Sequence, residues 1–369
     1  MVKYIYQHKN WTDFSWNEKS INSVFGEVRL MQGKLIGQMN TLGFSTKEEA
    51  TLTALTLDVV KSSEIEGELL NYEQVRSSIA RRLGINVSGL VPSNRHIEGI
   101  VEMMLDATQR FDSPLTDERL FGWHAALFPT GYSGPYKIEV GQYRTGEMQI
   151  ISGAMGKEKL HYEAIKPEFV QQEMDKFINW FNNENELDLV LKAAIAHFWF
   201  IIIHPFDDGN GRISRALTDL LLARAENSKD RFYSMSNQIL IERKNYYAIL
   251  QKVQHSSNDI TEWLDWFLNC LKNALISTEN TTKKIIHKAE FWKLNENTPI
   301  NERQRMMINK LFDGFEGKLQ SSKWAKITKT SPDTALRDIK DLIEKGILKQ
   351  TNEGGRSINY ELINFYSGN

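Results

Sequence analysis

Apolar side chains recur at intervals of three and four residues along most of the chain, the spacing of helices that bury one face. We expect helices at residues 18–39, 46–61, 72–82, 93–110, 115–128, 167–183, 187–203, 212–226, 242–254 and 259–277. In the first 290 residues, strand-like alternation is confined to residues 141–151, where Thr145-Gly146 supplies a turn. The pattern therefore predicts a mainly α fold with one small β-hairpin.

One predicted helix is apolar enough to be compared with a membrane span. Residues 187–203 are strongly hydrophobic, but Asp188, Lys192 and His197 interrupt them. The stretch is also shorter than the roughly 20 apolar residues that cross a bilayer. We therefore predict a helix buried in a protein core and no membrane contact.

Length and composition indicate an ordinary globular protein. At roughly 100–200 residues per domain, 369 residues predict two or three domains. The 45 basic and 47 acidic side chains nearly balance, which argues against wholesale electrostatic binding of nucleic acid or membranes. The single cysteine, Cys270, cannot form an internal disulfide, and the first residues lack the apolar stretch of a secretory signal. We expect a cytoplasmic protein.

Breaks in the pattern suggest the domain organisation. The first residues carry isolated aromatic side chains that are typical of a packed cap: Tyr4, Tyr6, Trp11, Phe14 and Trp16. A helix that begins in the polar stretch 277–284 should end before Asn297-Thr298-Pro299. We divide the chain into a cap with a following helix (1–90), a helical core (91–277), a linker helix (278–297) and a carboxy-terminal domain (298–369).

The carboxy-terminal domain has the outline of a winged helix-turn-helix. Helices are expected at 301–313, 321–327 and 332–345, followed by strands at 346–350 and 357–362. Its twelve basic and nine acidic residues make it mildly basic. On the third helix, Thr334, Arg337 and Lys340 could face DNA, with Arg356 on the wing, but Asp333, Asp338, Asp341 and Glu344 oppose this. DNA binding, protein docking and homodimerisation all stay open.

The most informative segment joins two predicted core helices. It reads His204-Pro205-Phe206-Asp207-Asp208-Gly209-Asn210-Gly211-Arg212-Ile213-Ser214-Arg215. Pro205 ends the first helix, and Gly209 and Gly211 permit backbone conformations in which successive N–H groups converge. The start of the next helix adds a positive dipole. The loop is therefore suited to hold an anion such as phosphate.

The charged residues of this loop indicate a reaction. Arg212 and Arg215 fall on one helix face and can reach the same anion, and Asp208 can hold Mg²⁺ beside it. His204 can act as a base near neutral pH. Together these groups predict phosphoryl or nucleotidyl transfer, which relies on positioning and charge stabilisation.

Three simpler interpretations of the loop fit less well. A calcium loop starting at Asp207 would need Gly and Glu where Arg212 and Thr218 stand. A P-loop needs Lys followed by Ser or Thr after its glycines. A plain structural turn is not excluded by physics alone, but it accounts for none of the charged groups together.

The segment matches in full the signature of Fic domains, His-x-Phe-x-(Asp/Glu)-Gly-Asn-Gly-Arg-x-x-Arg, and the chain resembles that family over about residues 95–275. The resemblance implies an all-helical Fic core in which His204 deprotonates a target hydroxyl. The hydroxyl then attacks the α-phosphate of ATP and leaves AMP on Ser, Thr or Tyr. It also implies the other roles in the loop: Phe206 anchors it, Asp208 holds Mg²⁺, Gly209, Asn210 and Gly211 cradle phosphate, Arg212 steadies the phosphates, and Arg215 meets the γ-phosphate.

The resemblance extends to residues on either side of the loop. The hairpin at 141–151 stands where the family has a flap that clamps a target segment by strand pairing, so Met148, Gln149 and Ile150 would contact the target. Lys166-Pro167 stands where many relatives have two prolines, so the fit is looser there. Tyr246 and Tyr247 stand where a later helix flanks the adenine, but they fit the core equally well.

A second, shorter match lies upstream. Ser62, Glu66 and Gly67 fit the inhibitory pattern (Ser/Thr)-x-x-x-Glu-(Gly/Asn) of Fic proteins whose inhibitory helix precedes the core. A carboxylate paired with Arg215 would occupy the place of the γ-phosphate. ATP would still bind, but its α-phosphate would be turned away from in-line attack. In some relatives the same glutamate helps to remove AMP, so the net direction stays open.

These observations favour an autoinhibited protein adenylyltransferase that uses ATP and Mg²⁺. An enzymatic alternative is removal of AMP, or transfer from another nucleotide, because the loop recognises phosphates and does not itself select the base. An alternative from another class is a DNA-binding regulator whose Fic core senses nucleotide. The sequence does not identify the target protein.

Overall fold

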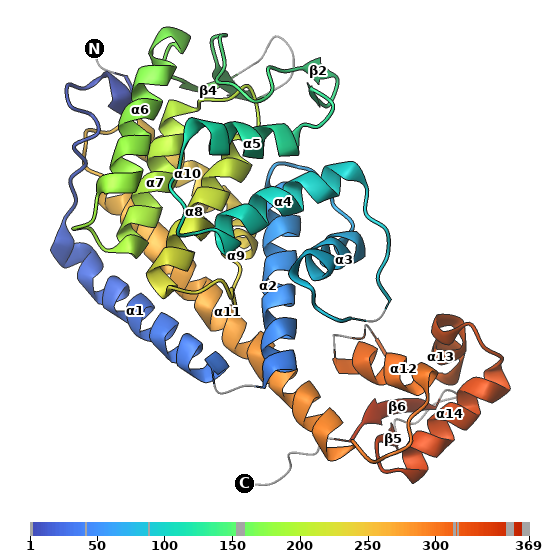
Figure 1. The fold of residues 1–369 in the computed structure, drawn as a ribbon. Coiled ribbons are helices and arrows are strands. Elements are labelled where there is room, and N and C mark those ends of the chain that lie inside the picture. Colours follow the sequence, from blue (N-terminus) through green and yellow to red (C-terminus); the bar gives the residue numbers. More distant parts are fainter. Residues whose placement is uncertain are drawn as a thin grey trace. The chain divides into compact units, whose positions relative to one another are not determined.

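Helices make up most of the described chain, and the strands form only small antiparallel pairs (Figure 1). The computed structural model describes residues 3–40, 43–87, 89–152, 159–312, 315, 317–351 and 358–363. The predicted fold class, mainly α with a small β flap, is confirmed. The chain separates into two units, Met1–Glu279 and Asn280–Asn369, and the division falls within one long helix, α11 (Thr261–Leu294).

The first unit contains nearly every helix that the apolar spacing predicts. Its helices are η1 (Ile5–Gln7), α1 (Glu18–Asn40), α2 (Phe44–Ile65), α3 (Tyr72–Leu83), α4 (Arg95–Gln109), α5 (Asp117–Leu127), α6 (Pro167–Asn183), α7 (Leu189–Ile203), α8 (Asn210–Glu226), α9 (Met235–Ile241), α10 (Arg243–Gln254) and the first part of α11. Helix α9 was not predicted, because two turns are too short for a periodic pattern to be recognised.

Helix α7 lies at the centre of this unit, beside α8 (Figure 1). Residues 190–203 are all buried, which explains the continuous apolar run. The polar residues within it are accommodated: Lys192 donates to the Glu184 carbonyl, and His197 bonds the hydroxyls of Thr218 and Tyr246 at 2.9 Å each. Across the described residues, no helix combines the length and the apolar character needed to cross a membrane.

The aromatic residues at the start of the chain pack onto this core. Tyr4 stacks on Tyr6 and meets the edge of Tyr162, while Trp11 and Phe14 contact the ring of Trp199. Tyr4 is 1% exposed and Trp11 is 6% exposed. The segment is therefore held by aromatic packing against helices that are distant in sequence.

The antiparallel flap is present, but the sequence pattern placed it wrongly. Strand β3 (Gln149–Ser152) pairs with β4 (Lys159–Glu163), so the turn does not lie at Thr145-Gly146. The residues just before β3 are instead part of the core: Tyr143 and Arg144 are buried and contact Phe206 and His204 of the 204–215 loop. A second short pair, β1 (Tyr132–Ser133) with β2 (Tyr136–Lys137), was not predicted.

The second unit has three helices followed by an antiparallel strand pair. These are α12 (Glu302–Phe312), α13 (Ser321–Thr328), α14 (Pro332–Glu344), β5 (Leu348–Thr351) and β6 (Asn359–Leu362). Trp324, Ile339 and Leu342 are fully buried at its centre. The predicted Gly354-Gly355 turn and Arg356 lie outside the described residues.

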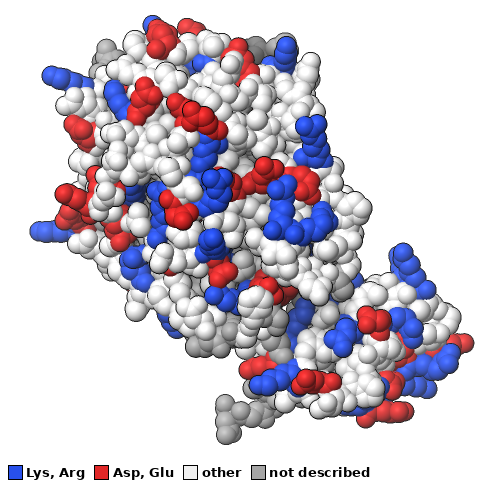
Figure 2. Space-filling view, in the orientation of Figure 1, with Lys and Arg blue, Asp and Glu red and all other residues white. Residues whose placement is uncertain are grey.

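Charge is distributed over the surface as the balanced composition suggests. On the visible face, basic and acidic side chains are interspersed (Figure 2). On α14, two of the four acidic residues are engaged within the unit: Asp338 is bound by Arg303 and Asn301, and Asp341 by Lys345 and Gln304.

We predict that Ile339→Ala lowers the free energy of unfolding of the second unit by about 2–5 kcal/mol, because it removes a fully buried aliphatic group. Hydrogen exchange of the full chain, read by mass spectrometry, would show faster exchange of the α12 and α14 amides. Ile358→Ala is the matched control, since Ile358 is 53% exposed. Equal effects of the two substitutions would contradict the packing described for this unit.

Candidate active site

The 204–215 loop is closed by its own side chains. His204 ends α7 in the left-handed conformation (φ 52°), and Gly209 (φ 81°) turns the chain into α8. The Asn210 amide bridges the turn, accepting from the Phe206 N–H at 3.0 Å and donating to the Phe206 carbonyl at 2.8 Å. Phe206 is fully buried and stacks on His124 with ring centres 4.3 Å apart. The loop conformation is therefore set by packing and internal hydrogen bonds.

Arg144, a buried arginine that the sequence analysis missed, holds this loop in place through hydrogen bonds. Arg144 donates from Nε to the His204 carbonyl at 2.7 Å and from Nη1 to the Gly146 carbonyl at 2.8 Å. Its Nη2 donates to the Ile165 carbonyl, and its backbone N–H donates to the Pro205 carbonyl at 2.9 Å. Arg144 thus ties the base of the flap to the end of α7. In the sequence, this role of Arg144 could have been suggested by the Tyr143-Arg144 pair beside the predicted turn.

The two acidic residues of the loop have different surroundings. Asp207 accepts from the Glu139 N–H at 2.9 Å, so it holds the neighbouring loop. Asp208 accepts from the Gly209 N–H at 2.5 Å and from the Ser133 hydroxyl, and its side chain is 41% exposed. No group of three or more metal-ligating side chains occurs among the described residues. A single exposed carboxylate beside an anion site does fit Mg²⁺, which takes one or two carboxylates together with substrate phosphates.

Arg215 is completely enclosed. It is 1% exposed, and its Nε donates to the Ser62 hydroxyl at 2.8 Å. Its Nη2 donates to the Ser62 carbonyl at 2.9 Å and to Glu66 Oε1 at 2.8 Å. Burial acts to lower the pKa of Arg215, but the Glu66 carboxylate, together with Tyr246 and Tyr247, outweighs it and raises the pKa. The structure thus brings Ser62 and Glu66 onto Arg215, 149 or more residues away in sequence.

The Glu66 carboxylate also lies over the glycine turn. A methyl group built on Gly211 would stand 2.1 Å from Glu66 Oε1, so the carboxylate fills the space directly above that glycine. Gly67 follows in the left-handed conformation (φ 87°), which allows the chain to turn away after α2. An anion therefore already occupies the nest formed by the start of α8 and Arg215.

The other arginine of the loop has a partner that the sequence analysis missed. Arg212 donates to Glu68 Oε2 at 3.0 Å and packs over the ring of Phe128. The second oxygen of Glu68 is hydrogen-bonded to His96 Nε2. Burial acts to raise the pKa of Glu68, but His96 and Arg212 outweigh it and lower the pKa. The only signal in the sequence was the position of Glu68, two residues after Glu66.

His204 lies at the end of α7, close to the Glu66 and Asp208 carboxylates. Its Nδ1 faces the Ile201 carbonyl at 3.3 Å, so in the neutral ring Nδ1 carries the proton and Nε2 is free to accept one. Desolvation by the surrounding residues lowers its pKa to about 4. The imidazole is therefore neutral, and able to act as a base, at pH 7.

The remaining predicted site residues divide between surface and core. Tyr246 is 2% exposed and bonds His197, so it is part of the core, whereas Tyr247 is 42% exposed beside Arg243. A role at the adenine stays a prediction for both. The Met148 carbonyl accepts from the Ala164 N–H at 2.9 Å, and Gln149 and Ile150 belong to β3.

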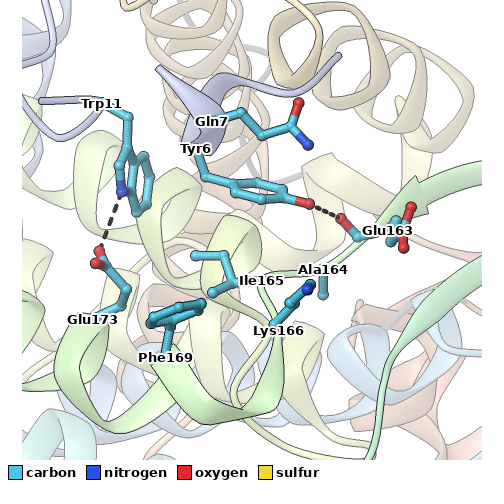
Figure 3. Close-up of a pocket in the computed structure, with 9 residues that line it drawn as sticks. All are labelled: Tyr6, Gln7, Trp11, Glu163, Ala164, Ile165, Lys166, Phe169 and Glu173. Atoms are coloured by element: carbon cyan, nitrogen blue, oxygen red, sulfur yellow. Dashed lines mark hydrogen bonds between the residues drawn. The ribbon is translucent and has the colours of Figure 1, made fainter. Parts of the chain in front are cut away.

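A separate pocket of about 330 Å³ lies between the start of the chain, the end of β4 and α6 (Figure 3). Tyr6, Trp11 and Phe169 provide its aromatic walls, with Lys166, Glu163 and Glu173 among them. The Tyr6 hydroxyl donates to the Glu163 carbonyl at 3.0 Å, and Trp11 donates to Glu173 at 3.2 Å. None of its lining residues belongs to the 204–215 loop.

We predict that His204 titrates with a midpoint near 4, because desolvation disfavours its charged form. The measurement is the pH dependence of its ring Cε1–H signal by NMR, assigned by the loss of that signal in His204→Gln. A midpoint at or above about 6.5, the value of an unperturbed histidine, would contradict the described surroundings of the ring.

Comparisons with known proteins find two family models and several relatives that match parts of this chain. Residues 4–85 match the model of a domain of unknown function (DUF4172), and residues 114–222 match the Fic/DOC family model. Protein adenylyltransferase fic-1 of Caenorhabditis elegans is 28% identical over 181 residues, 46% of this chain and 32% of that protein. A probable protein adenylyltransferase of Aquifex aeolicus is 31% identical over 33% of each chain. The chain thus spans about a third of the length of these relatives.

Two solved structures share the fold. A Fic family protein from Desulfovibrio desulfuricans superposes with a TM-score of 0.55 at 21% identity, covering 94% of this chain and 96% of that one. A Fic domain containing signaling protein from Bacteroides thetaiotaomicron gives a TM-score of 0.50 at 22% identity, covering 72% and 96%. These two likenesses show the fold, and the family model assigns residues 114–222. Residues 114–222 of this chain therefore form a domain of the Fic/DOC family.

Proposed function

We propose that this protein is a protein adenylyltransferase, which moves AMP from ATP to a serine, threonine or tyrosine hydroxyl of a target protein. The observation that carries the proposal is the Glu66 carboxylate seated above Gly211 and bonded to Arg215, because it marks a preformed anion site next to His204. Relatives named protein adenylyltransferase support the same activity at the level of the family.

The residues of the loop suit each part of this reaction. His204 Nε2 accepts the proton of the target hydroxyl, whose oxygen attacks the α-phosphorus. The bond between that phosphorus and the oxygen bridging to the β-phosphate breaks, and pyrophosphate leaves with its electron pair. Arg212 and Arg215 bind the phosphates and counter their charge. Asp208 would hold Mg²⁺, which neutralises charge on the phosphates when it is bound.

The flap provides a place for the target segment. In the described residues β3 pairs only with β4, which leaves its other edge free to accept a strand. Ile150 is 36% exposed on β3, and Met148 and Gln149 precede it. We propose that an extended target segment pairs with this edge, which brings its hydroxyl towards His204.

We further propose that the enzyme is autoinhibited. Glu66 occupies the side of Arg215 on which a γ-phosphate would be bound, so a bound ATP would be displaced from the pose that permits in-line attack. Two alternative reactions, removal of AMP and transfer from another nucleotide, would use the same groups. The transfer assay described below distinguishes them from transfer of AMP from ATP.

The exposed basic residues of α14 support a binding role for the second unit. Asp338 and Asp341 are engaged inside the unit, whereas Arg337 and Lys340 are exposed on α14. The winged-helix assignment, DNA or protein contact through residues 298–369, homodimerisation and a cytoplasmic location stay predictions.

We predict that His204→Ala lowers AMP transfer by about 10²- to 10⁴-fold, because the target hydroxyl loses its base. Transfer of label from α-labelled ATP to proteins of a cell lysate is measured alongside ATP binding by calorimetry. Retained binding with lost transfer is the expected result. Unchanged transfer in a folded His204→Ala protein would contradict the proposed activity.

We predict that Glu66→Gly raises transfer and self-modification by about tenfold or more, because Arg215 becomes available to the nucleotide. The matched control is Glu64→Gly, since Glu64 lies on the same helix with similar exposure (32% against 31%) but pairs with Lys61. Transfer is compared at equal thermal stability. If Glu66→Gly and Glu64→Gly behave alike, Glu66 is no inhibitor.

A further inference from the structure

Two carboxylates from the turn after α2, and not one, contact the arginines of the 204–215 loop. Glu66 binds Arg215 and Glu68 binds Arg212, at 2.8 and 3.0 Å respectively. We propose that Glu68 is a second inhibitory group, which occupies the phosphate subsite at Arg212 and must leave it before a nucleotide phosphate can bind there. This inference rests on the proposed function and concerns the regulation of the same site.

The turn after α2 explains how both carboxylates reach the loop. The Glu68 N–H donates to the Ser63 carbonyl and the Gly67 N–H to the Glu64 carbonyl, both at 3.0 Å. This is the Schellman arrangement, with Gly67 in the left-handed position. Glu66 and Glu68 are thereby set on either side of a rigid glycine turn. Their partners lie three residues apart on one face of α8.

Arg212 needs an anion on the side that Glu68 occupies. Its side chain is 6% exposed, its Nε has no partner among the described groups, and the ring of Phe128 covers it at 5.0 Å. Asp208 is more distant, at 3.9 Å from Nη2. A buried guanidinium needs hydrogen-bond acceptors, and a carboxylate supplies both an acceptor and a counter-charge. In this structure Glu68 supplies that counter-charge, and a phosphate that binds Arg212 has to replace it.

Helix α4 holds Glu68 in this position. His96, in the first turn of α4, contacts the carboxylate oxygen that Arg212 leaves free. Glu68 is therefore fixed to α8 and α4 at once, although its side chain remains 32% exposed. Arg215 is more deeply buried than Arg212 and makes three contacts with Ser62 and Glu66. Only one of these three contacts is to Glu66, just as one contact joins Glu68 to Arg212.

The two carboxylates should affect different steps. Glu66 alters how a bound triphosphate lies, which changes the rate of transfer. Glu68 competes with a phosphate for Arg212, which changes affinity, because the apparent dissociation constant rises as the binding-competent fraction falls. Since one short turn carries both groups, displacing Glu68 should also make Glu66 easier to displace.

The test measures binding of MgATP by calorimetry to full-length chains that carry His204→Ala, so that no transfer interferes. Glu68→Gln in this background should tighten binding about three- to tenfold, because the competing charge is removed. His96→Ala should tighten it less, since the Arg212 contact survives. The matched control is Glu49→Gln: Glu49 lies on α2, pairs with Arg76 and is 29% exposed, but does not touch the loop.

The outcomes separate this inference from the proposed function. Tighter binding in Glu68→Gln, with Glu49→Gln unchanged, supports the second inhibitory group, because a residue with a merely structural role would weaken binding when it is lost. If the chain binds MgATP but Glu68→Gln and Glu49→Gln bind equally, the inference is wrong and the proposed function stands. If no variant binds MgATP, Glu66→Gly included, the proposed function is wrong and the inference with it.

Discussion

A buried guanidinium is costly unless its N–H groups are hydrogen-bonded, and the site of this protein is organised by that constraint. Arg215 is 1% exposed within α8, so its N–H groups need acceptors from the protein or from a ligand. In this structure the partner is Glu66, and Ser62 completes the hydrogen bonding. The same N–H groups of Arg215 that bind the Glu66 carboxylate here would bind a nucleotide phosphate in the proposed reaction. Either anion satisfies the buried arginine, but both cannot occupy the same place. The inhibition proposed here would thus be a consequence of how Arg215 is stabilised in the protein without nucleotide.

The rest of the site is built to keep this anion nest in shape. Arg144 fastens the His204 carbonyl to the base of the flap, and Phe206 fills the core below the turn. His204 is held with one nitrogen towards a backbone carbonyl, in surroundings that keep it neutral. Catalysis by positioning requires such rigidity, because small displacements of the reacting groups are costly in rate.

Helix α2, which precedes Glu66, is anchored well away from that end. Asp58 on α2 accepts from the Ser234 hydroxyl at 2.6 Å and from the Ser236 N–H at 3.0 Å, in the buried region beside α8. Burial and the nearby Asp58 raise the pKa of Asp219 on α8 well above its usual value. These Asp58 contacts fix α2 at a point distant in sequence from Glu66 and Glu68.

Much of this could be predicted from sequence, because the determining features are local. Apolar spacing specifies most helices, Pro205 and the two glycines specify a turn between core helices, and the spacing of Arg212 and Arg215 specifies two cations on one face. What the sequence could not determine depends on contacts between distant segments. Alternation suggested a hairpin around Thr145-Gly146, but Arg144 finds buried carbonyl partners that outweigh a solvent-exposed strand. Apart from the position of Glu68 near Glu66, nothing in the sequence marks Glu68 or His96, and only the folded chain brings Arg212, Glu68 and His96 together.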